Sequence, residues 1–219
     1  MKVAIIGANG KVGSRLGQLL AERGDEPVGY IRKKEQAPDL EALGMKTNVA
    51  DLVETDVAEY ASMLEGTDVL VFAAGAGGAG VDATKAVDGE GVSKMITAAE
   101  NAGVKRFLLV SAFPDAWRDK DMPDSFEFYM KMKRKADAGL AKSSLDWTIL
   151  RPGTLTDDPG TGKVKLGPVI PYGQVSRDDV AAVLAELINN DETARLVLEL
   201  TEGATPIQEA VADQNRPLQ

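Results

Sequence analysis

The chain has 219 residues, a formal net charge of −9 at pH 7, and neither histidine nor cysteine. The missing cysteine excludes disulfides, thiolate nucleophiles and cysteine–zinc sites, and the missing histidine excludes a Ser-His-Asp triad; we expect no metal site. The acidic balance argues against nucleic acids and anionic membranes as partners, because both bind basic surfaces.

The length predicts one domain covering residues 1–219. The opening residues MKVAIIGANG reach a glycine loop too soon for a signal peptide, and no apolar run approaches the roughly 18 residues of a membrane span. We therefore expect a soluble, cytoplasmic protein.

Short β-branched runs alternate with segments in which apolar residues recur every three or four positions. This alternation is typical of a parallel sheet covered by helices on both faces. The predicted strands are residues 2–6, 27–31, 45–49, 68–74, 106–111, 147–151 and 196–200. The predicted helices are residues 11–23, 57–64, 83–101, 124–141 and 176–189, followed by a short helix near Thr205 and a frayed end at 215–219. We therefore predict a doubly wound parallel sheet, a Rossmann fold with three α/β/α layers.

Two irregular stretches, residues 113–123 and 154–174, follow predicted strand ends and contain several glycines and prolines. Ligands of open α/β sheets bind outside the carboxyl ends of the strands, so these stretches are candidate walls of a substrate pocket. Residues 154–219 would then be a small C-terminal portion that completes the pocket, and plain connecting loops are the alternative. Four aromatic side chains can make that pocket apolar, or can fill the core instead: Trp117, Phe126, Phe128 and Tyr172.

A GxxGxxG loop, Gly7-Ala8-Asn9-Gly10-Lys11-Val12-Gly13, follows the first predicted strand and begins the first predicted helix. Glycine permits the tight turn and the close approach of a pyrophosphate to backbone N–H groups, and the helix N-terminus favours the negative charge. A second glycine-rich stretch, residues 75–80, either walls the same cleft or is merely flexible. The residues expected to bind the cofactor here are Gly7, Asn9, Gly10, Lys11, Val12 and Gly13.

The end of the second predicted strand bears on the choice between NAD and NADP. An acidic residue there would bind the ribose 2′-hydroxyl of NAD, but the sequence has Arg32 and Lys33 instead. Arginine at this position accommodates a 2′-phosphate, so the sequence favours NADP, with NAD still possible. A solvated basic turn is the alternative.

Proton transfer in a chain without histidine or cysteine falls to a carboxylate, a lysine or a tyrosine. Tyr129 and Lys133 are four residues apart in one predicted helix, so we expect the ammonium to lower the phenol pKa and to hydrogen-bond a ribose. The YxxxK spacing is weak evidence alone, since Tyr30 and Lys34 match it too. Ser111 ends the preceding strand, where its hydroxyl can hold a substrate carbonyl or serve as a simple turn residue.

At these residues the sequence resembles the short-chain dehydrogenase/reductase superfamily, in particular its compact, atypical NAD(P)-binding branch related to NmrA-like and epimerase-like proteins. The resemblance runs almost end to end. It rests on the loop at 7–13, Asp51-Leu52, Ala73-Ala74-Gly75, Val104–Phe107 leading to Ser111, Tyr129 with Lys133, and the run from Leu145 to Thr156.

The resemblance implies roles for these positions. Asp51 and Leu52 would flank the adenine, Ala73, Ala74 and Gly75 would border the nicotinamide ribose, and Pro152 and Gly153 would reach the nicotinamide. Tyr129 would be the acid/base, Lys133 the ribose anchor and Ser111 the carbonyl polariser. The sequence departs from the family in the long spacing between Ser111 and Tyr129, and the portion after Gly153 is too short for a full sugar-nucleotide site.

Three functions remain open at this point. The first is an NAD(P)H-dependent oxidoreductase that exchanges a hydride with a small carbonyl or alcohol, in which Tyr129 transfers the proton. The second is a non-catalytic NADP(H) sensor that signals to a protein partner, and the third is a flavin- or quinone-type reductase in which Tyr129 is dispensable. The expected ligands are NADP and a small-molecule substrate, and the chain would be a monomer or a homodimer.

Overall fold

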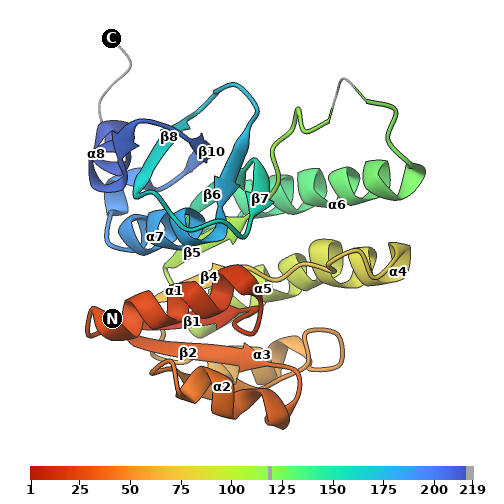
Figure 1. Cartoon of the computed structure of the whole chain (residues 1–219). Helices are drawn as coiled ribbons and strands as arrows, with labels where there is room; N and C mark the ends of the chain where they lie inside the picture. Colours follow the sequence, from red (N-terminus) through yellow and green to blue (C-terminus); the bar gives the residue numbers. More distant parts are fainter. Residues whose placement is uncertain (118–119, 216–219) are drawn as a thin grey trace.

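The computed structural model describes residues 1–117 and 120–215. Their strands form one nine-stranded sheet in the order β11-β8-β10-β6-β5-β4-β1-β2-β3, and a separate pair β7-β9. The strands are β1 (Lys2–Ile6), β2 (Glu26–Ile31), β3 (Lys46–Val49), β4 (Val69–Phe72), β5 (Arg106–Val110), β6 (Asp146–Pro152), β7 (Thr154–Thr156), β8 (Lys163–Gly167), β9 (Gln174–Ser176), β10 (Leu196–Glu202) and β11 (Thr205–Pro206). Figure 1 shows the central strands following one another from β2 low in the view to β8 near the top.

The α-helices lie in two layers, one on each side of this sheet. They are α1 (Lys11–Glu22), α2 (Ala37–Glu41), α3 (Val57–Met63), α4 (Val81–Thr84), α5 (Val92–Ala102), α6 (Asp124–Ala141), α7 (Arg177–Ile188) and α8 (Ile207–Ala212). Short 3-10 turns are η1 (Lys34–Gln36), η3 (Asp191–Thr193) and η4 (Asp213–Asn215), and a π-helical segment, η2 (Lys85–Gly91), joins α4 to α5.

The core is divided by the sheet because successive residues of a strand point to opposite faces. In β1, Val3 and Ile5 pack with α1, α2, α7 and α8, whereas Ala4 and Ile6 pack with α3, α5 and α6. The strands from β3 to β6 run parallel in the order 3-2-1-4-5-6, and β10 extends the parallel sheet beyond β6. This confirms the predicted three-layer Rossmann fold, in which the ligand cleft opens where β1 and β4 adjoin.

The sequence prediction was wrong in two segments. Residues 154–174 are not simply irregular, because they contain β7 and β8, and β8 pairs antiparallel with β10. The predicted helix at 83–101 begins earlier, at Val81, and its middle part is π-helical. The expected fraying at 215–219 falls mostly on residues 216–219, which lie outside the described residues. No helix among the described residues has the length and apolar character needed to cross a bilayer.

Candidate functional site

Three adjoining cavities lie along the carboxyl edge of the parallel strands. The outer cavity, about 480 Å³, lies between the ends of β1, β2 and β3 and the loop after β4. The central cavity, about 460 Å³, shares the residues 73–76 with it and extends to α6. The aromatic cavity, about 200 Å³, continues from the central one, since Ser111, Phe126, Tyr129 and Leu155 line both. Together the three cavities form one continuous groove along this edge of the sheet.

The glycine loop after β1 is shaped by close backbone contacts. Gly7 has φ +87°, and a Cβ there would lie 2.6 Å from the backbone of Ala74. A Cβ on Gly13 would lie 2.3 Å from the carbonyl oxygen of Gly7, so both positions require glycine for steric reasons. Gly10 precedes α1 as its N-cap, which leaves the first N–H groups of that helix open to an anion.

The predicted cofactor residues are distributed along this groove. The outer cavity is lined by Gly7, Asn9, Gly10, Arg32, Asp51 and Leu52. Both the outer and the central cavity are lined by Ala73, Ala74 and Gly75, and the central cavity also by Val12 and Lys133. The aromatic cavity is lined by Pro152 and Gly153. Three predicted cofactor residues line none of these cavities. Gly13 packs against the backbone of Gly7, Lys33 is exposed, and Lys11 pairs with Asp157. The second glycine stretch also borders the groove, through Gly75, Gly77, Gly78 and Gly80.

The wall of the outer cavity at 51–55 is fixed by a lysine that sequence reasoning missed. Lys94 of α5 donates hydrogen bonds to the carbonyl oxygens of Leu52, Val53 and Thr55 at 2.9, 2.8 and 2.6 Å. Asp51 closes the turn by accepting from the N–H of Val53 at 2.8 Å. The adenine wall expected at Asp51 and Leu52 is therefore a tightly bonded loop.

Ser111, Tyr129 and Lys133 meet where the central cavity adjoins α6. Ser111 is buried, 4 % exposed, and its hydroxyl has no hydrogen-bond partner among residues 1–117 and 120–215. The Lys133 ammonium lies 5.6 Å from the centre of the Tyr129 ring. A serine hydroxyl without a partner, a phenol and a lysine thus border one space, as the YxxxK interpretation requires.

Asp88 is the residue that sequence reasoning missed in this group. It lies on η2, is fully buried, and its carboxylate is 3.1 Å from the Lys133 ammonium. It also accepts a hydrogen bond from the N–H of Ala76, at 3.0 Å. A π-helical turn alters which residues of a helix face its neighbour, and such turns are frequent at functional sites. No motif marks an aspartate inside a predicted helix, so only the fold reveals this pair.

Lys133 lowers the pKa of the Tyr129 phenol as expected, but this effect does not decide the net shift. Burial raises the pKa of the Tyr129 phenol above its usual value, and this outweighs the nearby ammonium of Lys133, which lowers it. The carboxylates of Asp88 and Asp137 raise the pKa further. Because the net shift of the phenol pKa is upward from its ordinary value of 10.0, the phenol is protonated at neutral pH.

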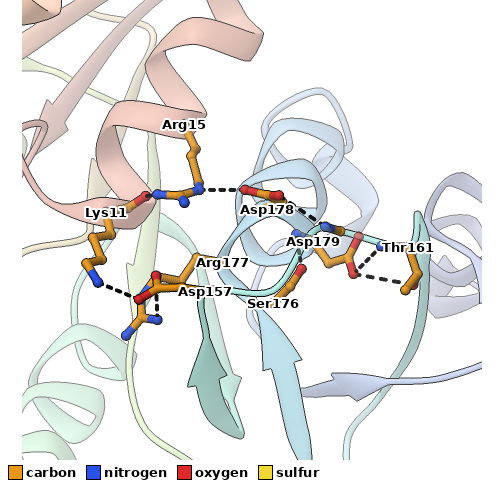
Figure 2. A network of polar contacts seen from close by, with 9 residues as sticks. Lys11, Arg15, Asp157, Thr161, Ser176, Arg177, Asp178 and Asp179 are labelled. Carbon is orange, nitrogen blue, oxygen red and sulfur yellow. Dashed lines mark hydrogen bonds and ion pairs between the residues drawn. The ribbon is translucent and has the colours of Figure 1, made fainter.

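A polar network ties the glycine loop helix to the C-terminal portion of the chain (Figure 2). Lys11 and Arg177 both pair with Asp157, at 2.5 and 2.9 Å, and Arg15 of α1 pairs with Asp178 of α7 at 2.5 Å. The Lys11 and Arg15 partners lower the pKa values of Asp157 and Asp178. Both aspartates are therefore charged at neutral pH, and the pairing weakens as the pH falls below 3.8, their ordinary pKa.

The buried member of this network is Asp179. Its carboxylate accepts from the N–H groups of Thr161 and Gly162, at 3.0 and 2.9 Å, and it is 3 % exposed. We expect Asp179→Ala to lower the free energy of unfolding in urea by about 2–3 kcal/mol, because it leaves two loop donors without their charged acceptor. Asp178→Ala, at a half-exposed position, should lower it by less than about 1 kcal/mol. Equal losses for both variants would contradict this assignment.

The fold order, the glycine loop and the groove at the β1–β4 junction together define a dinucleotide-binding protein of the Rossmann class. More particularly, the chain belongs to the NAD(P)H-binding family, whose profile matches residues 7–191. This confirms the resemblance to atypical, epimerase-like short-chain dehydrogenases, and the chain is an NAD(P)-binding protein.

Relatives of known sequence and structure agree with this assignment. The chain is 41% identical to a Bacillus subtilis protein named as an uncharacterized sugar epimerase, YhfK, over 96% of this chain and 99% of that protein. It is 31% identical to the oxidoreductase ylbE from Lactococcus lactis, with a TM-score of 0.87 and coverage of 97% and 96%. It is 27% identical to ChuY, an anaerobillin reductase from Escherichia coli O157:H7, with a TM-score of 0.78 and coverage of 92% and 97%.

Proposed function

We propose that this protein is an NADPH-dependent reductase that transfers a hydride to the carbonyl carbon of a small substrate. One observation carries the proposal: Ser111 and Tyr129 line both the central and the aromatic cavity. A carbonyl at that junction would meet the unpartnered, buried hydroxyl of Ser111 on one side and the phenol of Tyr129 on the other. The reductase names of two structural relatives support the same class of reaction.

Bound NADPH supplies the hydride. Tyr129 is the proton donor: its phenol proton passes to the carbonyl oxygen as the carbonyl carbon accepts the hydride, which yields an alcohol and leaves a phenolate. The Ser111 hydroxyl donates a hydrogen bond to the same oxygen and stabilises the negative charge that develops there. Within the part of the chain that the structure describes, Ser111 has no hydrogen bond that it would have to break first.

Lys133 anchors the cofactor ribose in this proposal. Its ammonium donates a hydrogen bond to the Val110 carbonyl at 3.2 Å and forms an ion pair with the Asp88 carboxylate at 3.1 Å. An ammonium has three donors, so a further donor is available to a ribose hydroxyl in the central cavity, which Lys133 lines. Asp88 is a positioning residue, because it contacts Lys133 and holds its ammonium in place.

We infer a preference for NADPH from Arg32. It lines the outer cavity beyond β2, is exposed, and has no ion pair or hydrogen bond among the residues described by the structure. Arg32→Ala should weaken NADPH binding roughly 10- to 100-fold, since a charged hydrogen bond to phosphate contributes about 1.5–3 kcal/mol, and should leave NADH binding nearly unchanged. A fluorescence titration with each dinucleotide measures both effects.

The matched control is Lys33→Ala, which removes the neighbouring exposed charge that lines none of the three cavities. It should change NADPH affinity by a small factor that disappears at high salt. If wild type binds NADH and NADPH equally, or if Arg32→Ala weakens both equally, the inferred 2′-phosphate contact is wrong.

The experiment that tests the reaction itself uses NADPH deuterated at nicotinamide C4. Turnover of a carbonyl substrate must place deuterium on the former carbonyl carbon, detected by mass spectrometry of the alcohol. Tight NADPH binding with no transfer to any carbonyl would instead favour a dinucleotide sensor. Transfer that persists at the wild-type rate in Tyr129→Phe would favour a reductase in which the cofactor alone performs the chemistry.

A further inference from the structure

The aromatic cavity differs from the other two in the number of aromatic side chains that line it. Aromatic rings come from three separate segments: the loop after β5, the first turns of α6, and the stretch before β9. Phe113 and Tyr172 pack edge to face, with ring centres 5.3 Å apart, and Phe126 and Tyr129 are 6.1 Å apart. Trp117 completes the wall and has φ +61°, a conformation that non-glycine residues seldom adopt.

No charged side chain lines the aromatic cavity among the residues that the structure describes. Two ammonium groups lie against lining rings without being part of the lining: Lys120 over Trp117, 3.9 Å from the ring centre, and Lys133 beside Tyr129, 5.6 Å from the ring centre. A carboxylate or phosphate inside the cavity would lose hydration without gaining a cationic partner from these lining side chains, which costs several kcal/mol. Anionic substrates are therefore disfavoured.

The polar groups of the cavity are equally few. Thr154 and Tyr172 hydrogen-bond to each other, their oxygens 2.6 Å apart, which engages one of their two hydroxyl protons. The hydroxyls of Ser111 and Tyr129 remain, both at the junction with the central cavity. One carbonyl oxygen can use both of them, whereas the several hydroxyls of a sugar would stay without partners.

We propose that the substrate is a small, uncharged, flat aromatic carbonyl compound, whose ring lies among Phe113, Trp117 and Tyr172 while its carbonyl meets Ser111 and Tyr129. This rests on the proposed reductase function and specifies its substrate class. The volume of about 200 Å³ is below the roughly 300–1,000 Å³ of pockets for drug-sized ligands, which fits a compact ring compound. In the reaction, the carbonyl carbon gains the hydride from NADPH and the oxygen gains the Tyr129 proton, so an aryl aldehyde becomes a benzylic alcohol.

Matched substrates test this class. We expect kcat/KM with NADPH to be higher for methyl 4-formylbenzoate than for 4-formylbenzoate, which differ mainly in charge, by about tenfold or more. Benzaldehyde should be preferred over cyclohexanecarbaldehyde, which has a similar size without the flat ring, and over glyceraldehyde, which is neutral and hydroxylated. A preference for the carboxylate or for glyceraldehyde would overturn the proposal.

Variants of the wall link this preference to the cavity. Trp117→Leu and Tyr172→Leu should each lower the ratio of kcat/KM for benzaldehyde over cyclohexanecarbaldehyde by about 2- to 10-fold, as expected for one aromatic contact of about 0.5–1.5 kcal/mol. Tyr172→Phe keeps the ring and should keep the ratio. Val169→Ala, at a side chain 85% exposed and outside the cavity, is the surface control. An unchanged ratio in both leucine variants would contradict the assignment.

A binding measurement separates this inference from the proposed function. Methyl 4-formylbenzoate, titrated into the protein with NADP⁺, should quench the tryptophan fluorescence of wild type, and Trp117→Leu should remove that quenching. Binding without any turnover would refute the reductase and retain the aromatic site. Failure of this probe to bind and to react would refute the aromatic site, whichever dinucleotide the protein binds.

Discussion

Replacing Tyr129 by phenylalanine should lower kcat/KM for carbonyl reduction by about 10²- to 10⁴-fold, the usual contribution of a positioned proton donor. The ring itself remains, so its packing against Phe126 and its place beside the Lys133 ammonium are retained. NADPH affinity and the free energy of unfolding should therefore stay close to those of wild type. Initial rates of NADPH oxidation, a fluorescence titration and urea denaturation measure the three quantities.

The direction of the Tyr129 pKa shift adds a second signature. Burial raises the phenol pKa above its usual 10.0, so the protonated form that reduction needs persists across neutral and mildly alkaline pH. The reductive rate should be flat there and fall only above pH 10, whereas oxidation of the alcohol, which needs the phenolate, should accelerate as the pH rises. A reductive rate that falls between pH 6 and 8 would exclude Tyr129 as the donor.

Ser111→Ala is the matched control for the same oxygen. It removes a hydroxyl that has no partner in the structure, so the fold loses no hydrogen bond. The variant should bind NADPH normally and lower kcat by a smaller factor than Tyr129→Phe, because it removes one hydrogen bond to the developing charge and no proton. Loss of NADPH binding in either variant would point to a cofactor contact in place of a catalytic one.

The architecture followed from the sequence because its signals are local. Apolar runs marked β1 to β6 and β10, the glycine loop marked the β1–α1 junction, and strand order then followed from the class of fold. Strand β8 was not predicted, because it is short and follows a glycine-rich stretch. Its residues alternate between exposed lysines and more buried side chains, and its partner β10 is distant in the chain. Such pairings depend on tertiary contacts that a local pattern does not encode.

The residues of the candidate site also divide into those that the sequence could predict and those that it could not. Residues on the glycine loop and the YxxxK pair are recognisable because their chemistry demands a fixed spacing. Asp88 is not, because its pairing with Lys133 requires a π-helical turn and the close approach of η2 to α6, where a Cβ on Gly89 would lie 2.9 Å from Met132. The net shift of the Tyr129 pKa could not be predicted for the same reason, since neither burial nor the Asp88 carboxylate beside Lys133 is visible in the sequence, although the lowering effect of Lys133 was expected correctly.

The Asp88–Lys133 pair should produce the largest stability effects in the protein. Asp88→Ala leaves a buried ammonium without its carboxylate and should lower the free energy of unfolding by about 3–5 kcal/mol, measured in urea. Asp88→Asn keeps the shape and the oxygen that accepts from the Ala76 N–H, so it should lose less. Both Asp88 variants should reduce turnover. A variant that displaces Lys133 should reduce it by about 10²-fold, because a small misplacement of a group at the reacting site lowers the rate strongly.

The double variant Asp88→Leu/Lys133→Met separates structure from function. It removes both buried charges and replaces them with apolar side chains, so its stability should return close to wild type or exceed it. Its NADPH affinity and turnover should not recover, because no ammonium remains to bind the ribose. A stable double variant that regains wild-type turnover would show that the pair only supports the fold, and would refute Lys133 as the ribose anchor. A double variant less stable than Asp88→Ala would show instead that the pair stabilises the protein through contacts beyond its own two charges.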